Sequence, residues 1–180
     1  MKKVFFCLAA IAMLAGCKDE KKADGPATTT IEDPKPPANL PYTVAYSSNF
    51  KIGNPEYCAM ILKGSWKDWE MNQLDDMKSW VADTIVAMSS NNKITKGVDS
   101  LQAKWKRFRS DLVSVTDSID AVISVRSVDK NEDWVLVWAR EMSVNKAGKK
   151  DTVAVMETWR INKDGKADMV MQFDRATRKE

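Results

Sequence analysis

The fold of this chain is decided by the stretch Thr152-Val153-Ala154-Val155-Met156-Glu157-Thr158-Trp159-Arg160-Ile161-Asn162-Lys163-Asp164-Gly165-Lys166-Ala167-Asp168-Met169-Val170-Met171-Gln172-Phe173. Apolar residues recur at every second position, which predicts one strand over Thr152–Ile161 and another over Ala167–Phe173. Between them, Lys163-Asp164-Gly165 is typical of a three-residue hairpin loop, because glycine occupies the position that favours a left-handed backbone. The stretch therefore predicts an antiparallel hairpin.

The loop length also predicts the register of this hairpin. Three pairs should face one another: Ile161 and Ala167, Trp159 and Met169, Glu157 and Met171. This register aligns the apolar faces of both strands, whereas a slip of one residue would mix core and solvent faces. Glu157 then shares its face with Trp159 and Ile161, so a carboxylate is predicted to point to the apolar side.

The hairpin continues a longer series of predicted strands. Beyond Leu112 the apolar pattern changes to a period of two, which indicates a sheet. Two more strands are predicted over Val113–Val128 and Trp134–Val144. Short polar turns at residues 129–132 and 145–148 separate them, so consecutive strands should pair antiparallel as a meander.

Helices are predicted before this sheet. Asn54-Pro55-Glu56 combines a cap residue, a proline at the first helical position and an acid in the first turn. A shorter helix is predicted from about Leu74 to Asp83, a strand over Thr84–Met88, and a third helix after Gly97. Helices followed by a curved antiparallel sheet define an α+β arrangement.

Three motifs, in this order, resemble the nuclear transport factor 2-like superfamily and its SnoaL-like branch. They are Trp80-Val81-Ala82-Asp83, Lys96-Gly97-Val98-Asp99 and Glu157 to Lys166. The resemblance implies a cone-shaped fold, with N-terminal helices packed on the concave face of a curved, mainly antiparallel sheet and an apolar pocket at the wide end. Members of the superfamily include isomerases, dehydratases, polyketide cyclases and many proteins that only bind.

Glu157 is the first candidate for a pocket residue. Parity across the turn at residues 145–150 allows Arg140 to lie opposite Glu157, with Trp138 opposite Trp159. Buried acids are rarely left unpaired. Glu157 is thus either a ligand-contacting carboxyl, with its pKa raised by desolvation unless Arg140 lowers it, or one half of a salt bridge at the edge of the sheet.

The resemblance also implies where catalytic residues would stand. Glu157 matches the strand position at which ketosteroid-isomerase members carry a protonated acid that stabilises an oxyanion. The position of their catalytic base falls at about Ser89, and neither Ser89 nor the first helix supplies that base or its tyrosine. Isomerase chemistry is therefore not expected. Glu157 and Asp83 remain weak candidates for an acid and a base, although an Asp between a helix and a strand more often orders the turn.

Tryptophan is unusually frequent, with seven in 180 residues. Six are predicted to point inward and, with Glu157, Arg140 and Met171, make up the candidate pocket: Trp66, Trp69, Trp80, Trp105, Trp138 and Trp159. Aromatic walls suit a flat hydrophobic ligand or a sugar ring, and filling the core is the alternative explanation.

The N-terminus predicts a lipoprotein. A basic start and about a dozen apolar residues, too few to span a membrane, precede Leu14-Ala15-Gly16-Cys17, which resembles a lipobox. We therefore predict a signal peptide over residues 1–16, a lipidated Cys17 that begins a proline-rich tether over 17–41, and one domain over 42–180. Lys18, in place of an Asp after the lipidated cysteine, resembles outer-membrane sorting, and Lys18-Asp19-Glu20 resembles the surface-export signal of Bacteroidota lipoproteins. We expect the domain to face the periplasm or the cell surface.

Composition narrows the chemistry. The net charge of +3 is too small to indicate nucleic-acid binding. Only Cys58 remains as a cysteine in the predicted domain, and the chain has no histidine, so serine or cysteine triads and the usual zinc, copper or iron ligand sets are not expected. We predict no metal and no cofactor.

Three functions stay open on the sequence. The first is a non-catalytic envelope module that binds a small apolar or amphipathic ligand, or a partner or second copy through its sheet. The second is a cofactor-independent lyase, isomerase or hydrolase that uses Glu157 and Asp83. The third is a structural or assembly role in the envelope, with the membrane reached through the lipid on Cys17.

Overall fold

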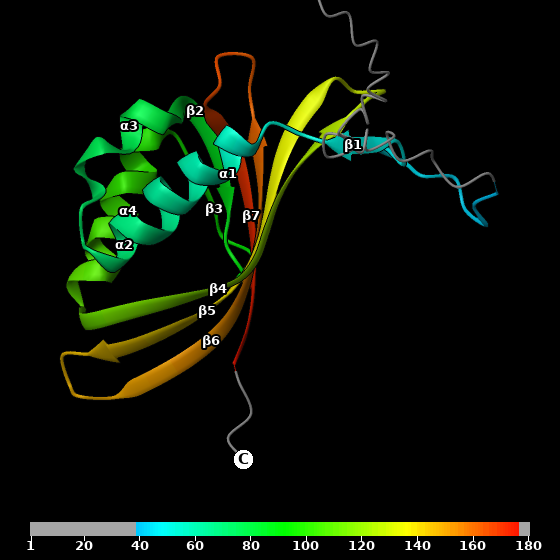
Figure 1. The fold of residues 1–180 in the computed structure, drawn as a ribbon. Helices are drawn as coiled ribbons and strands as arrows, with labels where there is room; N and C mark the ends of the chain where they lie inside the picture. The colour runs from blue at the N-terminus through cyan, green and yellow to red at the C-terminus, as the bar shows by residue number, and fades with distance from the viewer. Residues whose placement is uncertain (1–38, 177–180) are drawn as a thin grey trace, which may run out of the picture. The chain divides into compact units, whose positions relative to one another are not determined.

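The computed structural model describes residues 39–176, which form a curved sheet covered on one face by helices (Figure 1). The helical elements are α1 (Pro55–Ile61), a π-helical turn (Leu62–Lys67), α2 (Asp68–Glu70), a 3₁₀ turn (Leu74–Asp76), α3 (Met77–Trp80) and α4 (Val98–Ser110). The strands are β1 (Phe50–Ile52), β2 (Val81–Met88), β3 (Ile94–Lys96), β4 (Leu112–Ser127), β5 (Glu132–Asn145), β6 (Lys150–Ile161) and β7 (Ala167–Ala176). No helix within residues 39–176 is both long and apolar enough to cross a membrane.

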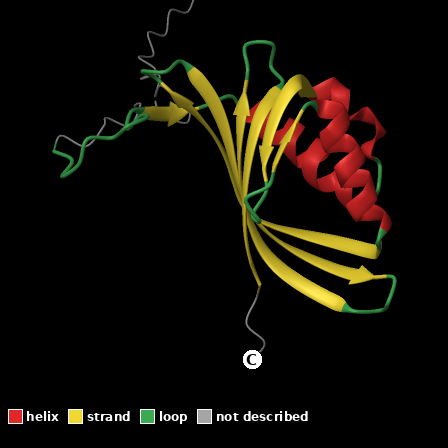
Figure 2. Cartoon of the chain, turned by 180° about the vertical axis from the view of Figure 1, so that it is seen from behind, coloured by secondary structure: helices red, strands yellow, loops and turns green. Residues whose placement is uncertain are grey.

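The strands form one mixed sheet in the order β1-β4-β5-β6-β7-β2-β3. Strands β4 to β7 are the predicted antiparallel meander, and only the contact between β7 and β2 is parallel. Seen from behind, all helices lie on the same side of the curved sheet (Figure 2). The predicted α+β class, with helices on the concave face of a mainly antiparallel sheet, is confirmed; the short strands β1 and β3 were not predicted.

The helix predicted to begin at Asn54-Pro55-Glu56 is not a regular α-helix throughout. After α1 the chain adopts a π-helical turn over Leu62–Lys67. Gly64 lies in this turn because the ring of Trp80 packs against it, and a Cβ at Gly64 would come within 2.3 Å of that ring. The turn carries Ser65 and Trp66 toward the concave face of the sheet.

The core lies between these helices and the sheet. Trp159 on β6 is 0% exposed and contacts two other indoles, with ring centroids 5.5 Å from Trp80 and 6.4 Å from Trp105. Ile61 and Leu101 pack in the same cluster. The concave side of β6 therefore anchors α1, α3 and α4 together.

The register between β6 and β7 differs from the prediction. Ile161 pairs with Ala167 as expected, but a β-bulge follows, so Trp159 faces Val170 and Glu157 faces Gln172. The extra residue is Asp168, whose carboxylate accepts two hydrogen bonds from Arg160, at 2.8 and 3.2 Å. Because of the bulge, Ala167 and Val170 both stay buried, while the carboxylate of Asp168 forms its ion pair with Arg160. Simple alternation with a period of two does not predict such an inserted residue.

The register between β5 and β6 also corrects the prediction. Glu157 faces Val137, not Arg140, and Trp159 faces Val135, not Trp138. The loop is tighter than expected because the side-chain oxygen of Asn145 accepts hydrogen bonds from the backbone N–H groups of Ala147 and Lys149. The pairing shifts by three residues, which moves Arg140 and Trp138 to the other face of the sheet.

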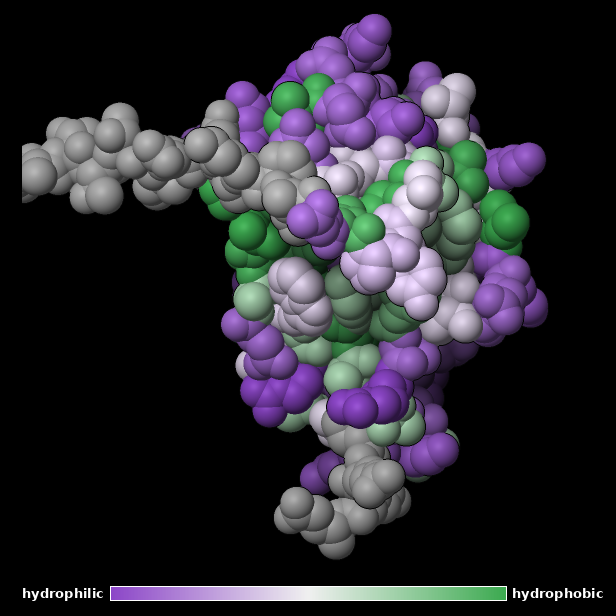
Figure 3. Space-filling model, turned by 90° about the vertical axis from the view of Figure 1, so that its right-hand side faces the viewer, coloured by the Kyte–Doolittle hydropathy of each residue, from purple (hydrophilic) through white to green (hydrophobic). Residues whose placement is uncertain are grey.

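The convex face carries an apolar row. Trp138 pairs with Met156, and Met156 pairs with Phe173, so one row crosses β5, β6 and β7. Trp138 is 37% exposed and Phe173 is 58% exposed. Figure 3 shows this side of the molecule, with pale and green side chains across the middle and hydrophilic side chains mainly at the top and the bottom. Arg140 also lies on this face, where it pairs with Asp120 at 2.9 Å.

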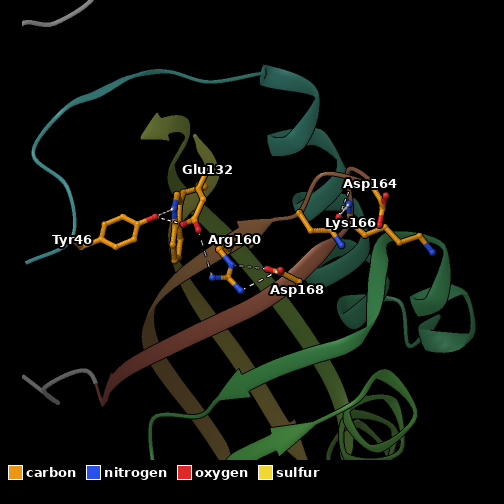
Figure 4. A network of polar contacts seen from close by, with 8 residues as sticks. Tyr46, Glu132, Arg160, Asp164, Lys166 and Asp168 are labelled. Carbon is orange, nitrogen blue, oxygen red and sulfur yellow. Dashed lines mark hydrogen bonds and ion pairs between the residues drawn. The ribbon is translucent and has the colours of Figure 1, made fainter. Parts of the chain in front are cut away.

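A polar network fastens the start of the described chain to this sheet (Figure 4). The Tyr46 hydroxyl donates to Glu132 and accepts from the indole N–H of Trp134 at 2.9 Å. Arg160 lies between Glu132 and Asp168 and forms ion pairs with both. Burial and the hydrogen bond to Glu132 raise the pKa of Tyr46. The network therefore links the segment before β1 to the bulge on β7.

Candidate functional site

A cavity of about 250 Å³ lies between the helices and the concave face of the sheet. It is lined by residues of the π-helical turn, α2, the β2–β3 turn, α4 and strands β5 to β7. These residues are Ser65, Trp66, Trp69, Ser89, Ser90, Asn91, Lys104, Trp105, Phe108, Glu141, Val155, Glu157 and Gln172. The cavity thus combines aromatic walls with two carboxyl groups and one lysine.

Glu157 is the most buried acid of this cavity, at 6% exposed. Its carboxylate accepts hydrogen bonds from the Trp159 indole N–H at 2.9 Å and from the Ser65 hydroxyl at 3.3 Å. Burial raises the pKa of Glu157 to about 7, and these two hydrogen bonds oppose that rise only in part. Within residues 39–176 no cation forms an ion pair with it. At neutral pH this carboxyl can therefore either donate or accept a proton.

Trp66 lies beside Glu157 and has an unused donor. Its side chain is 6% exposed, and its indole N–H has no hydrogen-bond partner among the described residues. The N–H is close enough to lower the pKa of Glu157, although it does not meet the geometry of a hydrogen bond. A buried donor left unpaired costs about 1–3 kcal/mol. A ligand atom that accepts a hydrogen bond would recover this free energy.

A second carboxyl stands on the neighbouring strand. Glu141 accepts a hydrogen bond from the indole N–H of Trp69 at 2.8 Å. Burial raises the pKa of Glu141, while the Trp69 hydrogen bond and the charge of Arg109 oppose the rise. Trp69 in turn meets the edge of Trp105, with ring centroids 6.0 Å apart. Glu141 and the two indoles therefore form one fixed wall of the cavity.

Asp117 extends this acidic region beyond the cavity. Asp117 on β4 lies directly opposite Glu141 on β5 in the register of the two strands. Burial, followed by the charges of Glu141, Glu70 and Glu157, raises the pKa of Asp117 to about 7. Neither carboxyl oxygen has a hydrogen-bond partner within residues 39–176. Three carboxyl groups with raised pKa values, Glu157, Glu141 and Asp117, therefore lie near one another on adjacent strands of the sheet.

Arg109 holds the end of α4 against the segment that carries Trp69. Its guanidinium donates to the backbone carbonyls of Trp69, Glu70 and Leu112 at 2.8, 3.0 and 3.1 Å. Arg109 is buried, and these three acceptors satisfy its polar head. It therefore positions the aromatic wall.

Lys104 reaches the cavity from α4. Its amino group donates to the hydroxyls of Ser89 and Thr95, at 2.7 and 3.2 Å. Burial lowers the pKa of Lys104, and the neighbouring charges of Lys93 and Arg107 lower it further. The cavity is therefore lined by two carboxyl groups from the sheet and by one lysine from α4.

The structure brings together only part of the predicted site. Glu157, Trp66, Trp69 and Trp105 line the cavity as predicted. Trp80 and Trp159 are buried in the core, outside the lining.

Four other predicted residues do not line the cavity. Arg140 and Trp138 lie on the convex face, for the register reason given above. Met171 pairs with Thr158, and Gln172 takes the place opposite Glu157 that was predicted for Met171. Asp83 is exposed within β2, because α3 ends at Trp80 and the strand starts earlier than predicted. Asp83 therefore does not join Glu157 in the lining of the cavity.

Two further predictions concern cysteines and metal. Cys17 lies outside the described residues. Cys58 on α1 is half-buried against the core, and burial raises the pKa of its thiol. Among the described residues, no three side chains of the His, Cys, Asp and Glu types are placed to hold a metal ion.

Sequence reasoning missed Glu141 and Lys104. Glu141 continues the alternation of Val135, Val137 and Ala139 on β5, so parity along that strand alone could have placed it on the concave face. Nothing local distinguishes Lys104 from the other basic residues of α4. Only the packing of α4 against the β2–β3 turn brings it to the cavity.

No family profile and no curated protein match this sequence. Solved structures share its fold. A SnoaL-like protein from Shewanella denitrificans, assigned as a polyketide cyclase, superposes with a TM-score of 0.57 at 11% identity, over 68% of this chain and 92% of its own. An NTF2-like protein of unknown function from an Exiguobacterium species gives a TM-score of 0.54 at 16% identity, over 64% and 98%.

An LEH-like epoxide hydrolase from M. tuberculosis also superposes, with a TM-score of 0.55 at 10% identity, over 67% of this chain and 83% of that protein. At such identities the likeness concerns the fold alone. The protein therefore has the NTF2-like cone fold that its sequence resembles, and its function has to be argued from its own cavity.

Proposed function

We propose that the protein is a binding module whose concave cavity holds one small organic ligand. The observation that carries the proposal is the indole N–H of Trp66, which has no hydrogen-bond partner within residues 39–176 and lies beside the buried carboxyl of Glu157. Protein interiors rarely leave such donors unpaired. A bound hydroxyl or carbonyl oxygen would accept from Trp66 and would exchange a second hydrogen bond with Glu157.

The walls and size of the cavity define the class of ligand. Trp69, Trp105 and Phe108 offer flat apolar surfaces, which suit a ring or a short apolar chain. The volume of about 250 Å³ lies below the roughly 300–1,000 Å³ of typical drug-sized sites. The ligand that fits is therefore a compact molecule with one polar oxygen-bearing end, and not a long lipid chain.

The test is to purify the protein gently from its own cells and to compare native and denaturing mass spectra. We expect an added small-molecule mass in the native spectrum that is lost on denaturation. The identified molecule should then raise the melting temperature of the wild type, and Trp66→Phe should reduce its affinity about tenfold, the equivalent of one hydrogen bond.

Trp134→Phe is the matched control, since the Trp134 indole N–H donates to Tyr46 outside the cavity. It should leave the affinity unchanged. A ligand whose affinity is the same in Trp66→Phe, Glu157→Gln and the wild type would contradict this site.

We further propose that the module acts in the bacterial envelope, anchored by lipid on Cys17. The lipobox and the proline-rich segment that follows it support this placement. Cys17→Ser should leave the precursor unprocessed and release the domain from the membrane fraction. Membrane retention of that variant without an acyl mass would exclude the anchor.

Catalysis at the same cavity is the second candidate function. Two carboxyl groups with raised pKa values, Glu157 and Glu141, line it, and such groups suit proton transfer near neutral pH. One protein with a similar fold is an epoxide hydrolase, so the reaction class that we propose for this alternative is a lyase, isomerase or hydrolase reaction. Turnover that survives both Glu157→Gln and Glu141→Gln would remove this candidate.

For a partner, we propose a second copy of the chain on the convex face. The row of Trp138, Met156 and Phe173 is apolar, and the oppositely charged Arg140 and Asp120 lie on the neighbouring strands, so two copies could match apolar to apolar and charge to charge. The molar mass from light scattering should be that of a dimer and should fall to that of a monomer in Trp138→Glu. A wild type that is monomeric at high concentration would exclude it.

A further inference from the structure

Ser89 and Lys104 meet in the lining of the cavity. Ser89 follows the last residue of β2, and Lys104 reaches it from the middle of α4. The Lys104 amino nitrogen is 2.7 Å from the Ser89 hydroxyl oxygen and 3.2 Å from that of Thr95. A hydroxyl in hydrogen-bond reach of a base that a third group orients is the arrangement of an activated nucleophile. We propose that Ser89 is a nucleophile, with Lys104 as its general base, that hydrolyses small acyl esters at this cavity.

The backbone holds the Ser89 hydroxyl in place. The N–H of Ser89 donates to the carbonyl of Lys93 at 3.0 Å, and the N–H of Asn92 donates to the carbonyl of Ser89 at 2.9 Å. Asn92 adopts the left-handed conformation that closes this turn, with φ at 63°. Ser89 therefore stands at the fixed end of a hydrogen-bonded turn, and a rigid support of this kind is what a nucleophile needs.

Lys104 is placed to be a base. Within residues 39–176 no carboxylate lies in ion-pair distance of its amino group, and both of its hydrogen-bond partners are hydroxyls. Burial and the cations Lys93 and Arg107 lower its pKa, and the carboxyls of Glu141 and Glu157 line the same cavity. When Lys104 is neutral, the 2.7 Å contact reverses, and Ser89 donates to the amine.

The reaction balances without any further group. The Ser89 oxygen bonds to the acyl carbon while its proton passes to the Lys104 amine. The bond from the acyl carbon to the alcohol oxygen then breaks, and the departing alcohol takes the proton from Lys104. A water molecule then gives a proton to the Lys104 amine while its oxygen bonds to the acyl carbon. The bond from the acyl carbon to the Ser89 oxygen breaks, the acid leaves, and the Ser89 oxygen takes the proton back from Lys104.

The cavity sets the class of ester. Trp105 and Phe108 line it together with Ser89, so they offer an apolar surface to the acyl group. A volume of about 250 Å³ admits a short acyl chain and excludes a long one. The inference uses the same cavity as the proposed ligand site but does not depend on Trp66 or Glu157.

The experiment treats the purified full chain with a small fluorophosphonate and with p-nitrophenyl acetate. The phosphonate should form a covalent adduct on Ser89, with loss of fluoride, as located by peptide mass spectrometry. Ser89→Ala should lose the adduct, and Lys104→Met should slow labelling and ester cleavage at least about 100-fold, the usual contribution of a general base. Lys104→Arg keeps the charge but supplies no base, so it should be equally slow.

Ser110→Ala is the matched control. Ser110 lies on the same helix as Lys104 but does not line the cavity, and its hydroxyl donates to the backbone carbonyl of Arg107 at 2.7 Å. This variant should label at the wild-type rate. The proposed ligand site is tested separately through the affinity of Trp66→Phe, so the failure of one proposal is distinguishable from the failure of the other. Absence of an adduct on Ser89, or equal labelling of Lys104→Met at an unchanged melting temperature, would overturn the inference.

Discussion

The two faces of one sheet carry tryptophans with opposite surroundings. On the concave face Trp159 is fully buried, and its N–H binds the carboxyl of Glu157. On the convex face Trp138 is 37% exposed, beside Met156. Both residues occur in strands of similar composition. The helices, more than the strands themselves, therefore decide which side of the sheet can hold a binding site.

Charged groups differ between the faces in the same way. On the convex side Arg160 and Asp168 form an ion pair that is partly exposed to solvent. On the concave side Glu157, Glu141 and Asp117 have raised pKa values and no ion pair among the described residues. Ionisation of these buried carboxyl groups on the concave face therefore costs free energy, and binding of a proton or of a suitable ligand would reduce that cost.

The largest expected effect is a loss of unfolding free energy when the tryptophans of the two faces, Trp159 and Trp138, are replaced. Trp159→Ala removes a fully buried ring and should lower the free energy of unfolding by about 3–5 kcal/mol. Trp138→Ala should lower it by only about 1 kcal/mol, since that ring is partly exposed. Urea denaturation followed by far-ultraviolet circular dichroism measures both. Equal losses would mean that the convex row is as well packed as the core.

The pH dependence of stability tests the buried acids. A carboxyl with a raised pKa holds its proton more tightly in the folded state than in the unfolded chain. Its contribution is therefore fully present below the ordinary pKa of 4.5 and is lost as the pH rises to about 7. Glu157→Gln should flatten this decline and be more stable than the wild type at pH 8 by up to about 3 kcal/mol.

Asp117 titrates in an overlapping window, so Glu157→Gln should reduce the decline without abolishing it. Asp164→Asn, at an exposed position in the β6–β7 loop, is the control and should leave the curve unchanged. A wild type whose stability does not fall between pH 4.5 and 7 would contradict the burial of these acids.

The next effect separates two indoles of the cavity. Trp69→Phe removes the hydrogen bond to Glu141 and should cost about 1–2 kcal/mol more than Trp66→Phe, which in ligand-free protein removes a donor without a partner among the described residues. Thermal unfolding of the two variants in parallel measures the difference. The reverse order would show that Trp66 already has a partner in solution.

The smallest expected effect concerns the convex ion pair. A double-mutant cycle of Arg160→Ala and Asp168→Ala should give a coupling energy of about 0.5–1 kcal/mol, because the pair is bidentate but partly solvated. The coupling should shrink in 1 M salt. A coupling near zero would leave the β-bulge without an electrostatic cause.

Local pattern predicted the α+β order, the four long strands and the inward direction of Glu157, because alternation and helical spacing are properties of neighbouring residues. It failed at the registers. Asp168 adds a residue to β7, and Asn145 tightens the β5–β6 loop. Arg140, Trp138 and Met171 therefore do not occupy the pocket positions that alternation had predicted for them. Bulges and side-chain-capped loops depend on contacts across strands, which alternation along one strand does not encode.

The sequence by itself therefore determined the class of fold, the buried carboxyl of Glu157 and the aromatic residues Trp66, Trp69 and Trp105 that line the cavity with it. Only the tertiary structure decided that Glu141 stands near Glu157, that Gln172 faces it and that Lys104 reaches Ser89. The physical reason is that polar partners are chosen by packing between distant segments, while burial of an apolar face is already written in its periodicity.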